Sequence, residues 1–235
     1  MTTELIVALD VPRIEDVPPI LSRLPAELTH FKVGLELFIR EGRAAVAMLS
    51  GQHKRIFLDL KLHDIPRTVA HAVASAAHLD VALLTLHASG GKAMIHAAAE
   101  AARDFGPRAP KLIAVTALTS LDQSDLVDLG IQRTVEAHTL ALADLALSSG
   151  ADGLVASVHE AAALRARFGS DFLLVTPGIR PAGTQAGDQK RIATPARAVE
   201  AGANFIVVGR PILDAPDPGA VARAILAEMG KAAGG

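Results

Sequence analysis

The sequence predicts an α/β protein of the (β/α)₈ TIM barrel class, with a single domain over residues 1–235. Eight short runs of apolar and β-branched residues recur along the chain, and Ala-rich stretches with helical spacing of apolar residues separate them. The first four runs begin near residues 5, 30, 55 and 81, a spacing typical of compact strand–helix units. Such alternation favours parallel strands with right-handed crossovers, and eight units favour closure into a barrel over an open sheet.

The predicted strands are the runs in which apolar side chains dominate. They lie at 5–10, 30–36, 55–62, 81–88, 111–118, 153–158, 172–179 and 205–210. The predicted helices have apolar residues three and four positions apart, which puts these side chains on one face. They lie at 37–49, 68–77, 92–102, 134–148 and 218–229. We expect a further small helix within 120–130 and an irregular loop at 180–191.

Composition and charge argue against several classes of protein. The formal net charge is −2 and 20% of residues are charged, so no basic field indicates a nucleic-acid or membrane partner. The absence of cysteine excludes thiolate catalysis and disulfides, and is typical of a reducing compartment. Tyr and Trp are also absent, which removes the stacking platforms of single-strand binders. We therefore expect a cytoplasmic protein without a nucleic-acid or membrane partner.

The structural alternative to a barrel is an open sheet that binds a dinucleotide. Such folds carry a Gly-x-Gly-x-x-Gly turn directly after the first strand. Here the first predicted strand runs into Asp10, Val11 and Pro12 instead. The sequence therefore argues against a dinucleotide cofactor.

Charged residues interrupt the third predicted strand near its end. Asp59 and Lys61 share one face of this strand, while leucines at 58, 60 and 62 occupy the other face, directed toward the helices. Active sites of such barrels lie at the carboxyl ends of the strands. The alternative is a structural ion pair that caps the core. The first predicted strand ends in Asp10 and the second carries Lys32, so four charges of alternating sign are expected at one mouth, which favours catalysis.

A second polar cluster follows the seventh and eighth predicted strands. Loops after these two strands are the usual phosphate site of the fold. Gly209 permits close backbone approach, and Arg210 offers a guanidinium fork for a dianion. Arg180 and Gln189, in the loop after the seventh strand, strengthen this interpretation. The alternative is an ordinary glycine-rich turn with a solvated arginine.

These motifs resemble those of orotidine 5'-phosphate decarboxylase of the bacterial type, and the resemblance covers nearly the whole chain. The central motif is Asp-x-Lys-x-x-Asp within FLDLKLHDIP at 57–66. The supporting blocks are VALD at 7–10, FKVG at 31–34, VTALTS at 115–120, TPGIR at 176–180, GDQKR at 187–191 and VGRP at 208–211. The resemblance implies cofactor-independent decarboxylation of orotidine 5'-phosphate to UMP and CO₂, the last step of de novo pyrimidine biosynthesis.

The resemblance also implies roles for individual residues. Lys61 would donate the proton to C6 of the pyrimidine, in a charged array with Asp59 and Lys32. Asp64 and Thr68 would reach the ligand from the neighbouring subunit of a homodimer. The implied substrate-binding residues are Asp10, Lys32, Asp59, Thr68, Thr119, Pro177, Arg180, Gln189, Gly209 and Arg210.

Two other functions remain open from the residues. A sugar-phosphate decarboxylase or epimerase on the same barrel shares the Asp-x-Lys-x-x-Asp layout and generally uses a divalent metal. A nucleotide-binding protein that lost the reaction would keep the fold, although the intact charged array argues against it. His63 and His87 lie near strand ends, but no metal-ligand spacing accompanies them, so we predict no metal.

Overall fold

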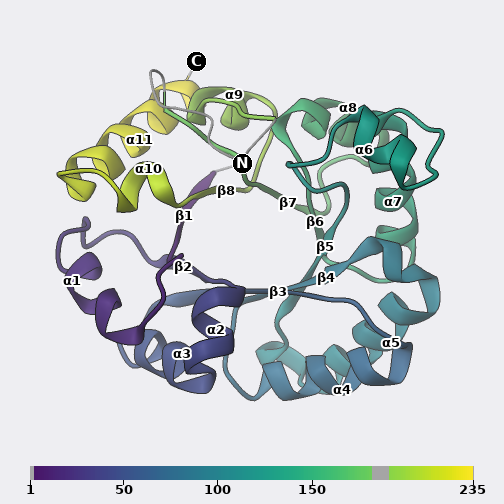
Figure 1. The fold of residues 1–235 in the computed structure, drawn as a ribbon, viewed down its shortest axis with the longest axis horizontal. Coiled ribbons are helices and arrows are strands. Elements are labelled where there is room, and N and C mark those ends of the chain that lie inside the picture. The colour runs from purple at the N-terminus through teal and green to yellow at the C-terminus, as the bar shows by residue number, and fades with distance from the viewer. Residues whose placement is uncertain (1–2, 182–190, 235) are drawn as a thin grey trace.

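The computed structural model of the chain describes residues 3–181 and 191–234. Within these ranges eight parallel strands form a closed barrel in chain order, and helices surround it (Figure 1). β8 pairs with β1 and closes the ring, with Leu5 opposite Ile206. The predicted TIM barrel is confirmed. The strands are β1 (Glu4–Ala8), β2 (His30–Val33), β3 (Arg55–Leu62), β4 (Leu83–His87), β5 (Lys111–Val115), β6 (Gly153–Val155), β7 (Leu173–Thr176) and β8 (Phe205–Val208).

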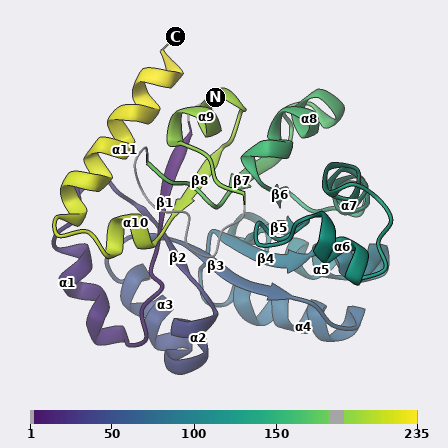
Figure 2. The same ribbon diagram turned by 45° about the horizontal axis from the view of Figure 1, so that its top comes forward.

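The outer ring is made of helices that follow the strands. Figure 2 shows α4 and α5 side by side along the barrel wall, where they pack against each other. The helices are α1 (Val17–Leu21), α2 (Leu35–Glu41), α3 (Arg43–Ser50), α4 (Pro66–Ala77), α5 (Gly91–Arg103), α6 (Gln123–Asp128), α7 (Val135–Ser148), α8 (Val158–Phe168), α9 (Pro195–Glu200), α10 (Arg210–Leu213) and α11 (Pro218–Ala233). The described residues contain no helix that is both long and apolar enough to span a membrane.

Seven of the eight predicted strands extend past the observed strand ends, and for two wrongly bounded elements the structure shows the reason. The single helix expected at 37–49 is interrupted at Gly42, whose φ of +56° ends α2 and starts α3 in a new direction. The strand expected at 153–158 ends earlier, because Ser157 is the N-cap of α8 and accepts a hydrogen bond from the His159 amide. The small helix expected within 120–130 is confirmed as α6, which Asp122 and Asp125 start with a capping box.

The buried apolar residues form two cores. A large one lies between strands and helices, and it contains Leu58, with Leu60 and Leu62 packed against it. A small one fills the inside of the barrel. Its members are Ile6, Ala8, Phe57, Leu83, Ile113, Val175 and Val207. The leucines of β3 thus face the helices, as predicted, and the inner core forms an apolar floor under the mouth.

The approach of β6 to β7 leaves no room for a side chain at Gly153. A Cβ there would lie 2.7 Å from the Leu173 Cβ and closer still to the Leu173 carbonyl oxygen. We expect Gly153→Ala to lower the free energy of unfolding by about 2 kcal/mol or more, because the barrel backbone would have to shift. Urea denaturation measures this change.

Gly230 in α11 offers a matched control, because a Cβ there meets no atom within 4 Å. Gly230→Ala is expected to leave the unfolding free energy equal or raise it by about 0.5 kcal/mol, since alanine favours a helix interior. Equal values for the two variants would contradict the close approach of the strands.

Candidate active site

A cavity of about 260 Å³ opens at the carboxyl ends of the strands. Strands β1, β2, β3, β5, β6, β7 and β8 or the residues that follow them contribute to its lining. Nine of the predicted site residues line it together: Asp10, Lys32, Asp59, Lys61, Thr119, Pro177, Arg180, Gly209 and Arg210. The two predicted clusters are therefore parts of one cavity.

Two predicted residues lie elsewhere, and a third is not among the described residues. Asp64 and Thr68 are exposed, beyond β3 and in the first turn of α4, and do not line the cavity of their own chain. One Asp64 carboxylate oxygen accepts a hydrogen bond from the Ile65 amide at 2.7 Å. Gln189 lies outside the described residues.

The four predicted charges form a row of alternating sign across the mouth. The Lys32 Nζ lies 2.8 Å from the Asp10 carboxylate and 3.7 Å from the Asp59 carboxylate. The Lys61 Nζ lies 2.8 Å from the same Asp59 oxygen, Oδ2. Asp59 is thus held between two ammonium groups, and the row sums to zero formal charge.

Asp59 is the most deeply buried member of this row, with 9% of its surface exposed. Burial acts to raise the pKa of its carboxyl group, but the charges of Lys32 and Lys61 and hydrogen bonds from Lys61 and Thr85 outweigh it, so the pKa is lowered from its ordinary value. Asp59 is therefore ionised at neutral pH. A fixed negative charge beside Lys61 keeps the ammonium oriented toward the cavity.

The backbone of β3 departs from regular pairing where it carries these charges. Leu58 pairs with Leu84 and Leu62 with Leu86, so three residues of β3 face one residue of β4. Lys61 has a φ of +51°, which costs a side-chain-bearing residue on the order of 1 kcal/mol or more. Such bulges redirect side chains next to active sites. Asp59 and Lys61 owe their joint direction to this bulge as well as to strand alternation.

The part of the cavity that follows β7 and β8 carries the predicted phosphate cluster. Arg180 is buried and donates to the Ile179 carbonyl at 2.9 Å, while Arg210 is exposed at the start of α10. Gly209 lies against the first strand, and a Cβ there would be 3.1 Å from the Asp10 carboxylate. A larger residue would therefore disturb the charged row as well as fill the cavity.

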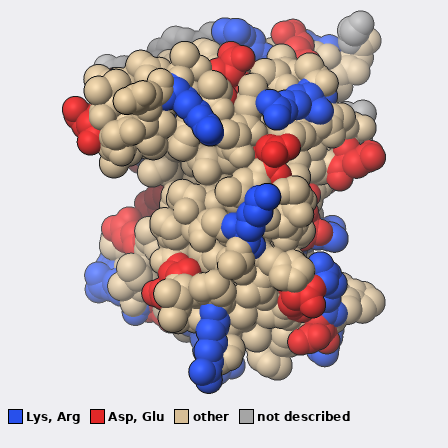
Figure 3. Space-filling view, turned by 90° about the vertical axis from the view of Figure 1, so that its right-hand side faces the viewer, with Lys and Arg blue, Asp and Glu red and all other residues tan. Residues whose placement is uncertain are grey.

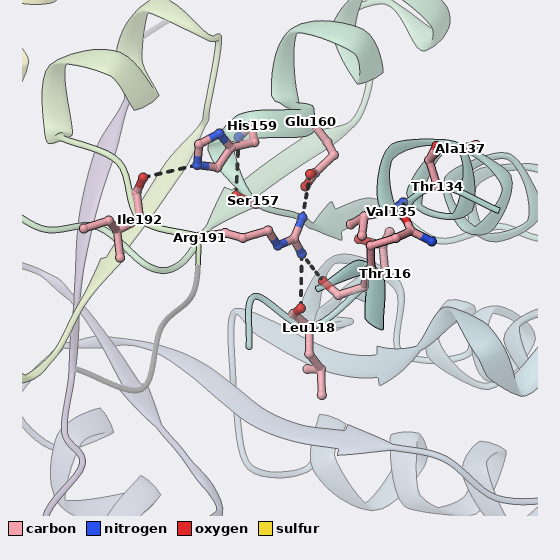
Figure 4. A network of polar contacts seen from close by, with 12 residues as sticks. Thr116, Leu118, Thr134, Val135, Ala137, Ser157, His159, Glu160, Arg191 and Ile192 are labelled. Carbon is pink, nitrogen blue, oxygen red and sulfur yellow. Dashed lines mark hydrogen bonds and ion pairs between the residues drawn. The ribbon is translucent and has the colours of Figure 1, made fainter. Parts of the chain in front are cut away.

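A buried ion pair joins Arg191, in the loop after β7, to α8 (Figure 4). The Arg191 guanidinium donates to Glu160 of α8 at 2.5 Å and to the carbonyls of Ala117 and Leu118 at 3.3 and 3.1 Å. The side chains of Arg191 and Glu160 are only 13% and 6% exposed. Arg191 is thereby attached both to α8 and to the loop after β5 that contains Thr119.

His63 and His87 lie beside each other, with ring centroids 5.4 Å apart. Burial, together with the charges of His63 and Lys61, lowers the pKa of His87, so its ring is neutral at pH 7. Among residues 3–181 and 191–234, no three His, Cys, Asp or Glu side chains gather as metal ligands. The predicted absence of a metal stays a prediction.

Comparison with known proteins identifies the family. The family model described as orotidine 5'-phosphate decarboxylase / HUMPS family matches residues 3–225. The chain belongs to this family. An orotidine 5'-phosphate decarboxylase of Moorella thermoacetica is 49% identical over 96% of this chain and 92% of its own length. One from Anaeromyxobacter sp. strain K is 52% identical over 94% of this chain and 96% of its own length.

The orotidine 5'-phosphate decarboxylase family also accounts for the architecture. The crystal structure of orotidine 5'-phosphate decarboxylase from Lactobacillus acidophilus matches with a TM-score of 0.85 and 41% identity, over 97% of this chain and 99% of that chain. The resemblance found in the sequence and the decarboxylase class of enzyme are confirmed. A sugar-phosphate enzyme on the same barrel is not favoured, because these relatives carry the decarboxylase name.

Three residues of this decarboxylase-family site escaped the sequence analysis. Thr85 lies under the charged row, but within β4 it reads as an ordinary β-branched strand residue. Glu160 lies in a helix that was not predicted, and Arg191 was quoted only as part of a motif. One feature of the sequence could have indicated this pair, namely an acidic residue, Glu160, among apolar helix positions. Buried acidic side chains are almost always paired, so such a residue predicts a basic partner.

The Glu160–Arg191 pair leads to a stability prediction. Glu160→Ala would leave the Arg191 charge buried without its partner, so we expect the unfolding free energy to fall by about 3 kcal/mol. Glu100→Ala is the control, because Glu100 pairs with Arg103 on the surface and should cost less than about 1 kcal/mol. Urea titrations of both variants test this. Equal losses would show that the buried pair is no stronger than a surface pair.

Proposed function

We propose that the chain decarboxylates orotidine 5'-phosphate to UMP and CO₂ without a metal or organic cofactor, and that Lys61 supplies the proton. The observation that carries this proposal is the Lys61 ammonium group, held 2.8 Å from Asp59 at the cavity between the two clusters. Family membership supports the reaction. The charge pattern supports the roles of the residues.

The proposed mechanism follows from the charge that develops on the substrate. When the bond between C6 and the carboxylate carbon breaks, CO₂ leaves and the electron pair stays on C6. No cofactor delocalises this pair, so a fixed cation must stabilise it. Lys61 provides the cation and then transfers its proton to C6, and solvent restores the proton on Lys61. Asp59 orients the Lys61 ammonium, and its own charge would repel the substrate carboxylate.

The remaining cavity residues are proposed to bind the substrate. Asp10 and Lys32 would hold the ribose hydroxyls, and Thr119 and Pro177 would contact the pyrimidine. The phosphate would be bound by Arg180, Gln189, Gly209 and Arg210. Binding energy from this remote group can organise the charges at the reacting carbon. The cavity supports this division, because the charged row comes from β1, β2 and β3 and the arginines follow β7 and β8.

We also propose that the working unit is a homodimer in which Asp64 and Thr68 complete the partner's site. Both residues are exposed and lie outside the cavity of their own chain. Nearby apolar side chains are exposed as well, with Leu35 at 46%, Ile39 at 79% and Ile65 at 66%. Exposed apolar residues of this size next to a motif are typical of an interface.

Mixing two inactive variants tests the shared site. Lys61→Ala and Asp64→Ala subunits, exchanged in equal amounts, should give about half heterodimers, each with one complete site. Activity should then rise from near zero to about a quarter of the wild-type value. No gain on mixing, in a sample that sedimentation shows to contain dimers, would exclude a contribution of Asp64 across the interface.

The cellular setting and the domain organisation remain proposals of the same kind. We propose that residues 1–235 act as one domain and that the protein works in the cytoplasm. The absence of cysteine and the proposed nucleotide substrate support a reducing, metabolite-rich compartment. The face seen in Figure 3, at the right of Figure 1, mixes acidic and basic side chains and offers no uniformly basic surface to a nucleic acid.

The direct test is the loss of ultraviolet absorbance of orotidine 5'-phosphate on addition of the purified protein, with a chelator present throughout. We expect turnover under chelator. Loss of turnover with chelator, together with activity on a sugar phosphate and a divalent metal, would overturn the proposal. Tight binding of UMP without any turnover would instead favour a nucleotide-binding protein that has lost the reaction.

A further inference from the structure

The bulge in β3 leaves polar groups that no regular strand pairing satisfies. Between the pairs Leu58 to Leu84 and Leu62 to Leu86, the only residue of β4 is Thr85. Its side chain is completely buried. The mechanism proposed above assigns it no role. Its hydroxyl nevertheless contacts two parts of the charged row.

The two hydrogen bonds of Thr85 have defined directions. The Lys61 amide can only donate, and it donates to the Thr85 Oγ1 at 2.8 Å. The ionised Asp59 carboxylate can only accept, and the Thr85 hydroxyl donates to its Oδ1 at 3.0 Å. The other oxygen of this carboxylate, Oδ2, binds the Lys61 Nζ at 2.8 Å. One hydroxyl therefore links the backbone of Lys61 to the carboxylate that orients its side chain.

We infer that Thr85 is a positioning residue for the decarboxylation, which holds the bulged backbone of Lys61 and the Asp59 carboxylate in the geometry that directs the Lys61 ammonium at the substrate. The inference rests on the proposed function. Lys61 adopts a φ of +51°, a conformation that persists only where the surroundings fix it. The Thr85 hydroxyl supplies such a restraint, since it replaces a strand-pairing partner for the Lys61 amide.

The chemistry of the link predicts which substitutions break it. Serine keeps a hydroxyl that accepts one hydrogen bond and donates another. Valine has nearly the same shape as threonine but can do neither, so it would leave both the amide and a carboxylate oxygen unsatisfied. The pair Thr85→Val and Thr85→Ser therefore separates the hydroxyl from the volume of the side chain.

Steady-state kinetics with orotidine 5'-phosphate tests the inference. We expect Thr85→Val to lower kcat by about 10- to 100-fold, because a small displacement of a reacting group has effects of this size. KM and the Kd of UMP should change by less than about threefold, since Thr85 is not among the residues that line the cavity. Thr85→Ser should restore kcat to within about fivefold of the wild type.

Thr116→Val is the matched control. Like Thr85, Thr116 is a buried threonine, and it directly follows β5, the neighbour of β4. Its hydroxyl donates to the Val155 carbonyl at 2.8 Å and not to a member of the charged row. This variant should lose stability while kcat stays within about twofold of the wild type. An equal fall of kcat in both variants would reduce Thr85 to a structural residue and overturn the inference.

A crystal structure of Thr85→Val tests the positioning role of Thr85 without a measurement of turnover. We expect the φ of Lys61 to leave the positive region or the contact between Lys61 and Asp59 to lengthen beyond hydrogen-bonding distance. Unchanged values of +51° and 2.8 Å would overturn the inference even if the proposed reaction holds. If the wild type does not turn over orotidine 5'-phosphate, the proposed function fails, and this structural result still tests the positioning role.

Discussion

Lys61→Ala is expected to lose turnover of orotidine 5'-phosphate, with kcat lower by on the order of 10⁴-fold or more, while UMP still binds. The variant lacks both the cation that stabilises the carbanion and the proton that quenches it, and each effect alone is large. UMP binding should persist because the arginine side of the cavity is untouched. Loss of ultraviolet absorbance gives kcat, and calorimetry with UMP gives the Kd.

Lys111→Ala is the control for the loss of a lysine. Lys111 begins β5, at the opposite end of the barrel from the mouth, and its Nζ pairs with Asp152 at 2.9 Å. Turnover by the Lys111→Ala variant should match that of the wild type. Near-normal turnover in a correctly folded Lys61→Ala variant would exclude Lys61 as the proton donor.

Arg210→Ala is expected to lower kcat/KM by about 100- to 1000-fold without loss of the fold, since a guanidinium can donate two charge-assisted hydrogen bonds to a phosphate. Arg210 is exposed at the start of α10, so the unfolding free energy should change by less than about 0.5 kcal/mol. Kinetics and urea denaturation of the same preparation measure both quantities.

A surface arginine outside the cavity provides the comparison. Arg223→Ala, on the exposed side of α11, should leave kcat/KM and stability unchanged. If Arg210→Ala has wild-type kinetics in a folded protein, Arg210 does not bind the phosphate, and Arg180 becomes the first alternative because it lines the same cavity.

The barrel and the charged row could be predicted because both follow from local patterns. Alternation along β3 was sufficient to predict that Asp59 and Lys61 share the inner face and three leucines the outer one, although the bulge also contributes to this arrangement. Parallel strands in chain order then bring their carboxyl ends together, so Asp10 and Lys32 had to meet them. No long-range information was needed for these conclusions.

The parts that could not be predicted depend on contacts between distant residues. The bulge at Lys61 is a mismatch between two strands, and neither strand alone reveals it. Thr85 reaches Asp59 across 26 positions of the chain, and Arg191 reaches Glu160 across 31. The break at Gly42 was missed for another reason, since a glycine inside an amphipathic stretch is compatible with a continuous helix at a modest cost.

The zero net charge of the row Asp10, Lys32, Asp59 and Lys61 separates capture of the substrate from its conversion. A balanced row exerts little attraction on a distant anion. If the arginines bind the phosphate as proposed, residues such as Arg210 would supply the long-range attraction, and dissolved salt would screen their field. Contacts of 2.8 Å above an apolar floor are much less screened. Raising the ionic strength should therefore increase KM and leave kcat nearly constant. Salt would then control the fraction of enzyme that holds substrate, but not the rate of turnover of the bound substrate.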